Sequence, residues 1–159
     1  MAPTDRETEA VPLPTRPVLF AYDGSALAAL AIQQASRQWP VGRDALVLCV
    51  WQPADVGFTP ISKRHFDARS ASEVKKAAGE TAAYGASLAN KAGFHAHGLA
   101  IEASPIWQGI IAAAQEHNAS VIVLGAHRRR GLTGHLLGSV ASAVAAHSRT
   151  PLLIVPQAD

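Results

Sequence analysis

Two short segments of the chain carry residue types that can hold an anion. One is Asp23-Gly24-Ser25, directly after an apolar run, and the other extends from Gly125 to Ser139 with glycines at 125, 131, 134 and 138. Glycine lets backbone N–H groups approach phosphate oxygens with no Cβ between them. We expect a helix to begin at Gly138-Ser139, where free N–H groups and the helix dipole favour an anion. The pattern indicates a phosphate-binding loop.

Each of these polar residues also has a structural interpretation, and the residues alone leave both open. The hydroxyl of Ser139 either adds to an anion site or only caps its helix. The carboxylate of Asp23 either accepts hydrogen bonds from ribose hydroxyls or shapes its turn. Arg128, Arg129 and Arg130 either pair with a polyphosphate or form a solvated basic loop.

Enzyme motifs are missing from the sequence. It has neither a GxxxxGK[ST] phosphate loop nor a GxSxG elbow. His95 and His97 stand two residues apart, and two histidines alone make a poor metal site. The single cysteine, Cys49, lies in an apolar run and is interpreted as a small buried residue. We therefore expect no catalytic residue, no metal site, and at most a slow ATPase.

Predicted strands and helices alternate along the chain and determine where these loops lie. Apolar runs predict strands over 18–22, 45–51, 94–101, 121–124 and 152–155, and helical spacing of apolar residues predicts a helix between each pair. The order indicates an α/β protein, a single-domain open five-stranded parallel sheet with helices on both faces. Ligands bind such sheets beyond the carboxyl ends of the strands, where both loops lie.

Several helix boundaries and faces follow from local signals. Ser70 and Glu73 form a capping box for the second helix, and Gly93 caps its end. Ser104-Pro105 opens the third helix, with serine as N-cap. A helical stripe on the second helix is formed by Val74, Ala77, Thr81, Tyr84 and Leu88.

Length and charge narrow the functional classes. The chain has 159 residues with a net charge of +2, which suits one domain and carries no dense basic stripe for DNA. Residues 1–16 contain charges and three prolines, so we expect a flexible tail followed by a domain over 17–157. Without an apolar leader or spanning run, we expect a cytoplasmic protein with no membrane partner.

The residues of both segments resemble those of the universal stress protein family. Residues 18–25 resemble its opening strand and turn, and residues 125–128, 136–140 and 151–156 resemble its closing half. The family signature is glycine, two residues, glycine, nine residues, glycine, then serine or threonine. Gly125, Gly138 and Ser139 match it in register, and the likeness covers about residues 17–156.

The resemblance implies a fold and a ligand. The fold is Rossmann-like, of the adenine nucleotide alpha hydrolase-like type, with strand order 3-2-1-4-5. The ligand is ATP or AMP, with or without Mg²⁺, in a protein that regulates stress response or dormancy. The implied contacts are ribose at Asp23, adenine at Val50, sugar or phosphate at Gly125, and phosphates at Gly138, Ser139 and Val140.

Two further expectations come with the resemblance. Family members usually form homodimers through the last strand, here Leu152 to Val155. The second signature glycine is replaced by Arg128, so Arg128 stands within the expected nucleotide site. An alternative function is a nucleotide-free dimeric interaction module of the same family, and Arg128 is the residue that favours it.

Overall fold

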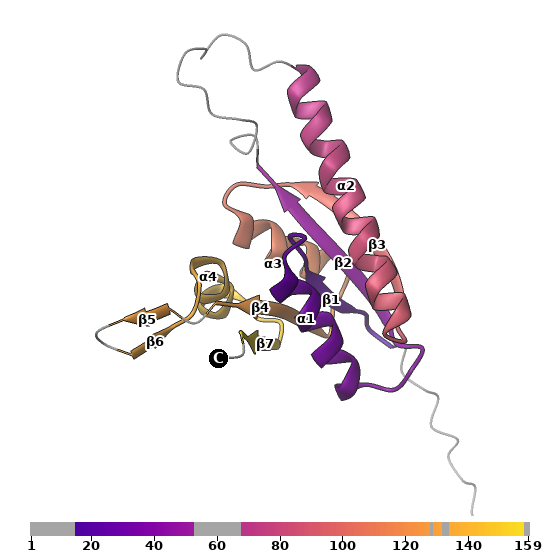
Figure 1. The fold of residues 1–159 in the computed structure, drawn as a ribbon, viewed down its shortest axis with the longest axis vertical. Helices are drawn as coiled ribbons and strands as arrows, with labels where there is room; N and C mark the ends of the chain where they lie inside the picture. Colours follow the sequence, from indigo (N-terminus) through magenta and orange to yellow (C-terminus); the bar gives the residue numbers. More distant parts are fainter. Residues whose placement is uncertain (1–14, 53–67, 128, 132–133, 158–159) are drawn as a thin grey trace, which may run out of the picture.

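The computed structural model describes residues 15–52, 68–127, 129–131 and 134–157. Five parallel strands form one sheet in the order β3-β2-β1-β4-β7, which confirms the expected fold and strand order (Figure 1). The elements are β1 (Val18–Ala21), α1 (Ala26–Ala35), the short 3-10 helix η1 (Ser36–Gln38), β2 (Asp44–Trp51), α2 (Ala68–Lys91), β3 (His95–Glu102), α3 (Ile106–Glu116), β4 (Val121–Ala126), β5 (Arg129–Gly131), β6 (Gly134–Leu136), α4 (Ser139–His147) and β7 (Leu152–Pro156).

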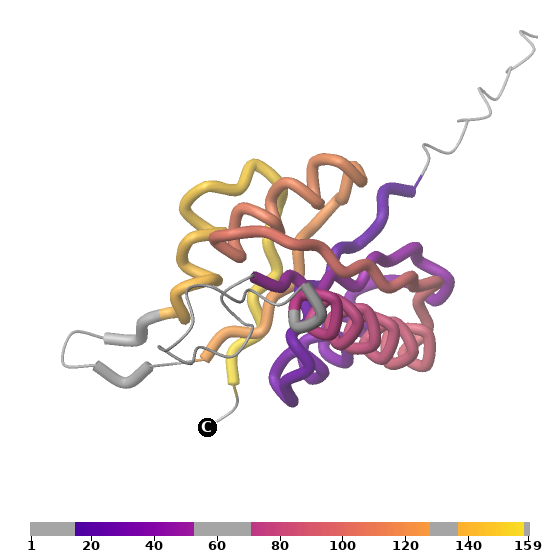
Figure 2. Tube along the Cα trace, turned by 90° about the horizontal axis from the view of Figure 1, so that it is seen from above, coloured from indigo at the N-terminus to yellow at the C-terminus, as the bar shows by residue number. Residues whose placement is uncertain are grey.

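Helices cover both faces of the sheet. Seen from above, α1 and α2 lie on one side and α3 and α4 on the other (Figure 2). Successive residues of β1 serve the two sides in turn, as expected for a buried parallel strand. Val18 and Phe20 belong to the core beneath α1 and α2, whereas Leu19 belongs to the core beneath α3 and α4. Both cores meet at β1, so the strand that precedes Asp23 is fixed from both sides.

The buried face of α2 matches the predicted stripe only in part, since Val74 and Leu88 pack against the core. Tyr84 is 62% exposed and Ala77 is exposed, whereas the residues that contact the sheet are small. Small side chains allow a close approach: a Cβ on Gly98 of β3 would lie 2.8 Å from the backbone of Ala82. The alanines buried at this contact are Ala78, Ala82, Ala86 and Ala89.

Two of the expected helix caps are also wrong. Helix α2 already begins at Ala68, so Ser70 and Glu73 lie inside its first turns and not at its N-terminal boundary. Helix α3 has Pro105 at its N-cap with no side-chain cap, in place of Ser104. The cap at Gly93 is confirmed, since Gly93 has a φ of +102° and donates its N–H to the Asn90 carbonyl at 3.1 Å.

The segment between β4 and α4, expected to be a loop, contains a short antiparallel ribbon. Strands β5 and β6 pair Arg129 with Leu136 and Gly131 with Gly134, as a sheet separate from the main one. Arg128 lies outside the described residues. The ribbon places two paired strands between the two ends of the glycine-rich segment.

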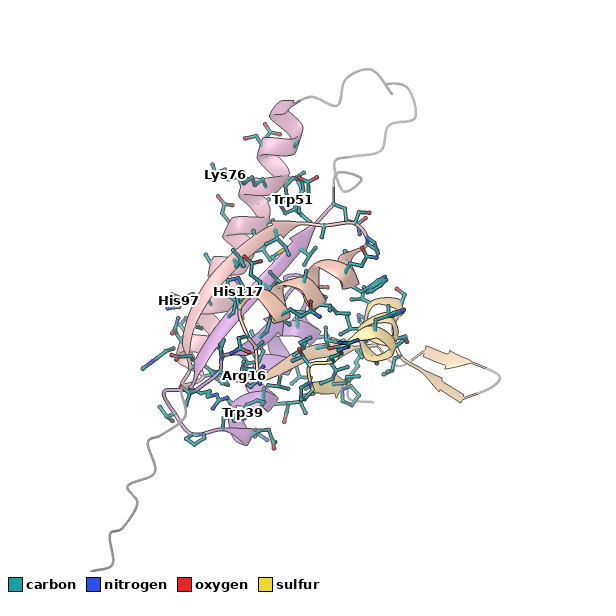
Figure 3. The ribbon with its side chains drawn as sticks, turned by 180° about the vertical axis from the view of Figure 1, so that it is seen from behind. Arg16, Trp39, Trp51, Lys76, His97 and His117 are labelled. Atoms are coloured by element: carbon teal, nitrogen blue, oxygen red, sulfur yellow. The ribbon has the colours of Figure 1, made fainter. Side chains whose placement is uncertain are left out.

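Arginine side chains form hydrogen bonds with the backbone at the end of the sheet opposite to the loops that follow β1 and β4. Arg16 donates from Nε to the Asn118 carbonyl at 3.0 Å and from an Nη to that of Ala119 at 3.0 Å. Figure 3 shows Arg16 and Trp39 at this end and Trp51 at the other.

The predicted tail falls almost wholly on residues 1–14, which lie outside the described part of the chain. Among the described helices, none is long and apolar enough to cross a membrane.

Candidate functional site

A pocket of about 160 Å³ opens at the carboxyl ends of the strands, between β1 and β4. The strand order reverses at this point, because β2 and β3 lie on one side of β1, and β4 and β7 on the other. Open α/β sheets bind ligands at such positions. Its lining is mostly apolar and consists of Ala21, Tyr22, Asp23, Ser25, Leu27, Ala28, Leu48, Val50, Ile106, Ile110, Leu124, Gly125, His127 and Val140.

Asp23 stands at the rim of the pocket in a tight turn. Gly24 has a φ of +84°, which side chains rarely adopt. One carboxylate oxygen of Asp23, Oδ1, accepts the N–H of Ser25 at 2.9 Å, and Ser25 Oγ accepts the N–H of Ala28 at 3.1 Å. The helix cap is therefore Ser25, while Asp23 shapes the turn and remains exposed. Turn formation and ligand contact are compatible here, because the turn uses only Oδ1.

Gly125 lines the pocket, but helix packing is what requires a glycine there. A Cβ on Gly125 would lie 2.8 Å from Cγ of Leu27 and 3.0 Å from the Leu27 carbonyl oxygen. Helix α1 thus lies directly against the end of β4. The glycine brings the two walls of the pocket together.

Gly138 has the opposite environment. It is the N-cap residue of α4, with φ −56°, and a Cβ added to it would meet nothing within 4 Å. Ser139 is the first residue of the helix and is exposed, and no side chain caps this end. Ser139 is therefore not the helix cap, and among the described residues the space in front of Gly138 is open.

The structure brings together four of the seven predicted site residues. Asp23, Val50, Gly125 and Val140 line one pocket. Gly138 and Ser139 are not part of its lining and stand next to Val140 at the start of α4. Arg128 lies outside the described residues.

Helix α3 forms a wall of the pocket that was not predicted from the sequence. Ile106 and Ile110 line the pocket from the first turns of this helix. Their helical spacing was visible in the sequence, but it only indicated a buried face. What the sequence did not reveal is that the first turns of α3 border the pocket between β1 and β4.

His127 was also missed as a lining residue. Its Nδ1 lies 3.0 Å from Oε1 of Gln157, and the N–H of Gln157 bonds to the Ala126 carbonyl at 3.1 Å. The residue after β7 thus holds the ring of His127 at the rim. The separation of 30 residues gives no signal in the sequence.

The phenol of Tyr22 is uncharged over the ordinary pH range. The residue is 4% exposed, and burial raises the pKa of its phenol. Negative charges on Tyr84, Asp23 and Cys49 raise this pKa further. Its backbone N–H bonds to the Leu48 carbonyl at 2.8 Å, so the floor of the pocket continues the β1–β2 pairing.

Metal binding has no support from clustered side chains. Within the described part of the chain, no three His, Cys, Asp or Glu residues come together in a possible metal site. His95 instead faces Asp44, with 4.0 Å between Nδ1 and Oδ1. The pocket instead combines a mostly apolar lining with the polar side chains of Asp23, Ser25 and His127.

Comparison with known proteins defines the class. The model of the Universal stress protein family matches residues 14–156, and the chain belongs to this family. The solved structure of the hypothetical protein MJ0577 has a TM-score of 0.73 with 20% sequence identity, over 92% of this chain and 99% of the other.

Two other solved structures share the fold and contain ligands. A universal stress protein from Archaeoglobus fulgidus in complex with dAMP has a TM-score of 0.57 and 21% identity, over 87% of this chain and 95% of that one. A universal stress protein in complex with cAMP has a TM-score of 0.54 and 19% identity, over 89% and 97% of the two chains.

Proposed function

We propose that this protein binds an adenine nucleotide, ATP or AMP, in the pocket between β1 and β4. The observation that carries the proposal is the meeting of Asp23, Val50, Gly125 and Val140 at the point where strand order reverses. In the proposed arrangement the base lies among the apolar side chains, and the ribose lies at Asp23. The phosphates extend toward Gly138 and Ser139 at the start of α4.

The size of the pocket supports this division of the ligand. Pockets that enclose a drug-sized molecule have volumes of roughly 300–1,000 Å³, whereas this one has about 160 Å³. It suits the base and part of the sugar. The phosphates would then lie over the surface at Gly138, where an added Cβ would meet nothing within 4 Å among the described residues.

Relatives in the same fold support an adenine ligand. One such structure contains dAMP and another contains cAMP. Mg²⁺, if it accompanies the nucleotide, would be held chiefly by the phosphates, since Mg²⁺ is usually bound through substrate phosphates and one or two carboxylates. Asp23 is the carboxylate in the lining of the pocket.

Titration calorimetry with ATP and AMP, with and without Mg²⁺, tests the proposal. Asp23→Asn keeps the oxygen that accepts the Ser25 N–H, so the turn should persist, while the charge is lost. We expect affinity to fall by about tenfold or more, since hydrogen bonds to charged groups contribute about 1.5–3 kcal/mol. Asp44→Asn, at the start of β2 and outside the pocket lining, is the control and should leave affinity unchanged.

The same calorimetry also tests the alternative function, a nucleotide-free interaction module. If the folded wild-type protein shows no heat with either nucleotide, the nucleotide proposal is wrong and the nucleotide-free interaction module is favoured. If ATP binds but Asp23→Asn binds equally well, the ribose contact is wrong.

We also propose a homodimer formed through β7. This strand is an edge of the sheet, and Leu152, Leu153 and Ile154 on it are only half-buried. An apolar edge strand is a template for pairing with a second chain. Family membership further supports a regulatory role in stress response or dormancy, which we place in the cytoplasm.

A further inference from the structure

The side chain of Asn90, near the end of α2, forms hydrogen bonds with the outer edge of β3. Its Oδ1 accepts the N–H of Ala96 at 3.0 Å, and its Nδ2 donates to the Ala96 carbonyl at 3.1 Å. Nδ2 also donates to the Ala86 carbonyl within α2 at 2.9 Å. The carboxamide thus pairs with both backbone groups of one strand residue, as a residue of a neighbouring strand would.

The backbone groups of Ala96 are those that an added strand would need. The N–H of His95 bonds to the Arg43 carbonyl at the start of β2, so His95 faces β2 and Ala96 faces away from it. Backbone direction alternates along a strand, so Gly98, Ala100 and Glu102 also face outward. β3 ends the sheet on this side, and Figure 3 shows His97 on it at the margin of the molecule.

We propose that Asn90 closes the β3 edge to strand pairing and confines strand-mediated self-association of this protein to the β7 edge. In a two-fold antiparallel pair of β3 strands centred on Leu99, Ala96 of one copy would stand opposite Glu102 of the other, and Gly98 opposite Ala100. Asn90 occupies Ala96, which removes the outer pairings of such a ladder. The inner pairings that remain are too short to hold two chains together.

The β7 edge differs from this arrangement. The N–H of Gln157 faces β4, where it bonds to the Ala126 carbonyl, so alternation turns Leu152 and Ile154 outward. No side chain in the described residues bonds to the backbone of either residue, by contrast with Ala96. With two open edges the chain would form open-ended assemblies, whereas one open edge gives a closed pair.

Two substitutions at Asn90 separate edge closure from simple loss of hydrogen bonds. Asn90→Ala and Asn90→Lys both remove the bonds to Ala96. Only the lysine leaves a charge beside the edge, and a charged side chain there discourages pairing. Ser120→Ala is the stability control, since Ser120 Oγ bonds to Pro17 and Arg43 at the far end of the sheet.

Sedimentation of the full-length protein over a range of concentrations tests the proposal. For Asn90→Ala we expect the weight-average mass to rise to roughly twice that of the wild type or more, because an isologous contact doubles the assembly. Asn90→Lys and Ser120→Ala should keep the wild-type mass. Equal masses for Asn90→Ala and the wild type, or equal growth of both Asn90 variants, would overturn the proposal. Since the wild-type mass is the reference, the test does not depend on nucleotide binding or on the β7 dimer.

Discussion

Gly125 and Gly138 belong to the same sequence signature but have different surroundings in the structure. The first is enclosed by Leu27, and the second faces open space. The sequence predicted both as members of one anion-binding segment. It could not separate them, because the difference lies in how closely α1 approaches β4.

Alanine substitution of the two glycines should therefore have different effects on the free energy of unfolding. Gly125→Ala should lower the free energy of unfolding by about 1–3 kcal/mol, the usual cost of adding an atom to a filled space. Gly138→Ala should change it by less than about 0.5 kcal/mol, as at an unconstrained surface position. Urea unfolding measures both, and a Gly138 variant as unstable as the Gly125 variant would contradict the open space at α4.

The raised pKa of Tyr22 leads us to expect a loss of stability at alkaline pH. Its folded-state pKa is raised above the usual value, so the unfolded chain loses its phenol proton first. The contribution of Tyr22 to stability is complete below about pH 10, the ordinary tyrosine value, and declines as pH rises through the folded pKa. Unfolding between pH 8 and 11 should show a smaller decline for Tyr22→Phe. An identical decline in both proteins would show that Tyr22 does not cause it.

At the scale of elements, α2 shows what a sequence pattern leaves open. Alanine and glycine are so frequent in this helix that several faces looked equally apolar, and the large residue Tyr84 suggested the wrong one. The sheet instead contacts the face with the smallest side chains, because β2 and β3 approach closely. Strands were easier to predict, since a run of apolar residues buried on both faces has no competing face.

Two glycines of α2 test this close approach directly. A Cβ on Gly85 would lie 2.6 Å from the Tyr22 ring and 2.7 Å from Val47, whereas a Cβ on Gly79 would meet nothing within 4 Å. Gly79→Ala should raise the free energy of unfolding by about 0.5–1 kcal/mol through helix propensity. Gly85→Ala should lower it by about 1–3 kcal/mol. Thermal unfolding decides, and stabilisation by both substitutions would contradict the described packing.

At the scale of the whole molecule, the strand order was predictable because the family resemblance and right-handed crossovers leave few arrangements. The pocket was predicted less completely. Residues that directly follow strands, such as Asp23 and Gly125, were identified because strand ends meet at one edge of the sheet. Ile106 and the contact of His127 with Gln157 were not, since they depend on where α3 begins and where β7 ends in space.

Substitutions at Ile154 test the proposed pairing through β7. Ile154→Pro removes an outward N–H of β7, whereas Ile154→Ala removes most of the same side chain and keeps the N–H. We expect the wild type and Ile154→Ala to sediment as dimers and Ile154→Pro as a monomer. Circular dichroism checks that each variant is folded. A dimeric proline variant, or a monomeric wild type, would contradict pairing through β7.

Hydrogen exchange with and without saturating ATP tests the central claim, that the pocket between β1 and β4 holds an adenine nucleotide. We expect ATP to slow exchange in residues 22–28, 48–51, 125–127 and 138–141, which surround the pocket and the start of α4. Unchanged exchange in these segments, or slowing only elsewhere, such as along α2 and β3, would contradict the account.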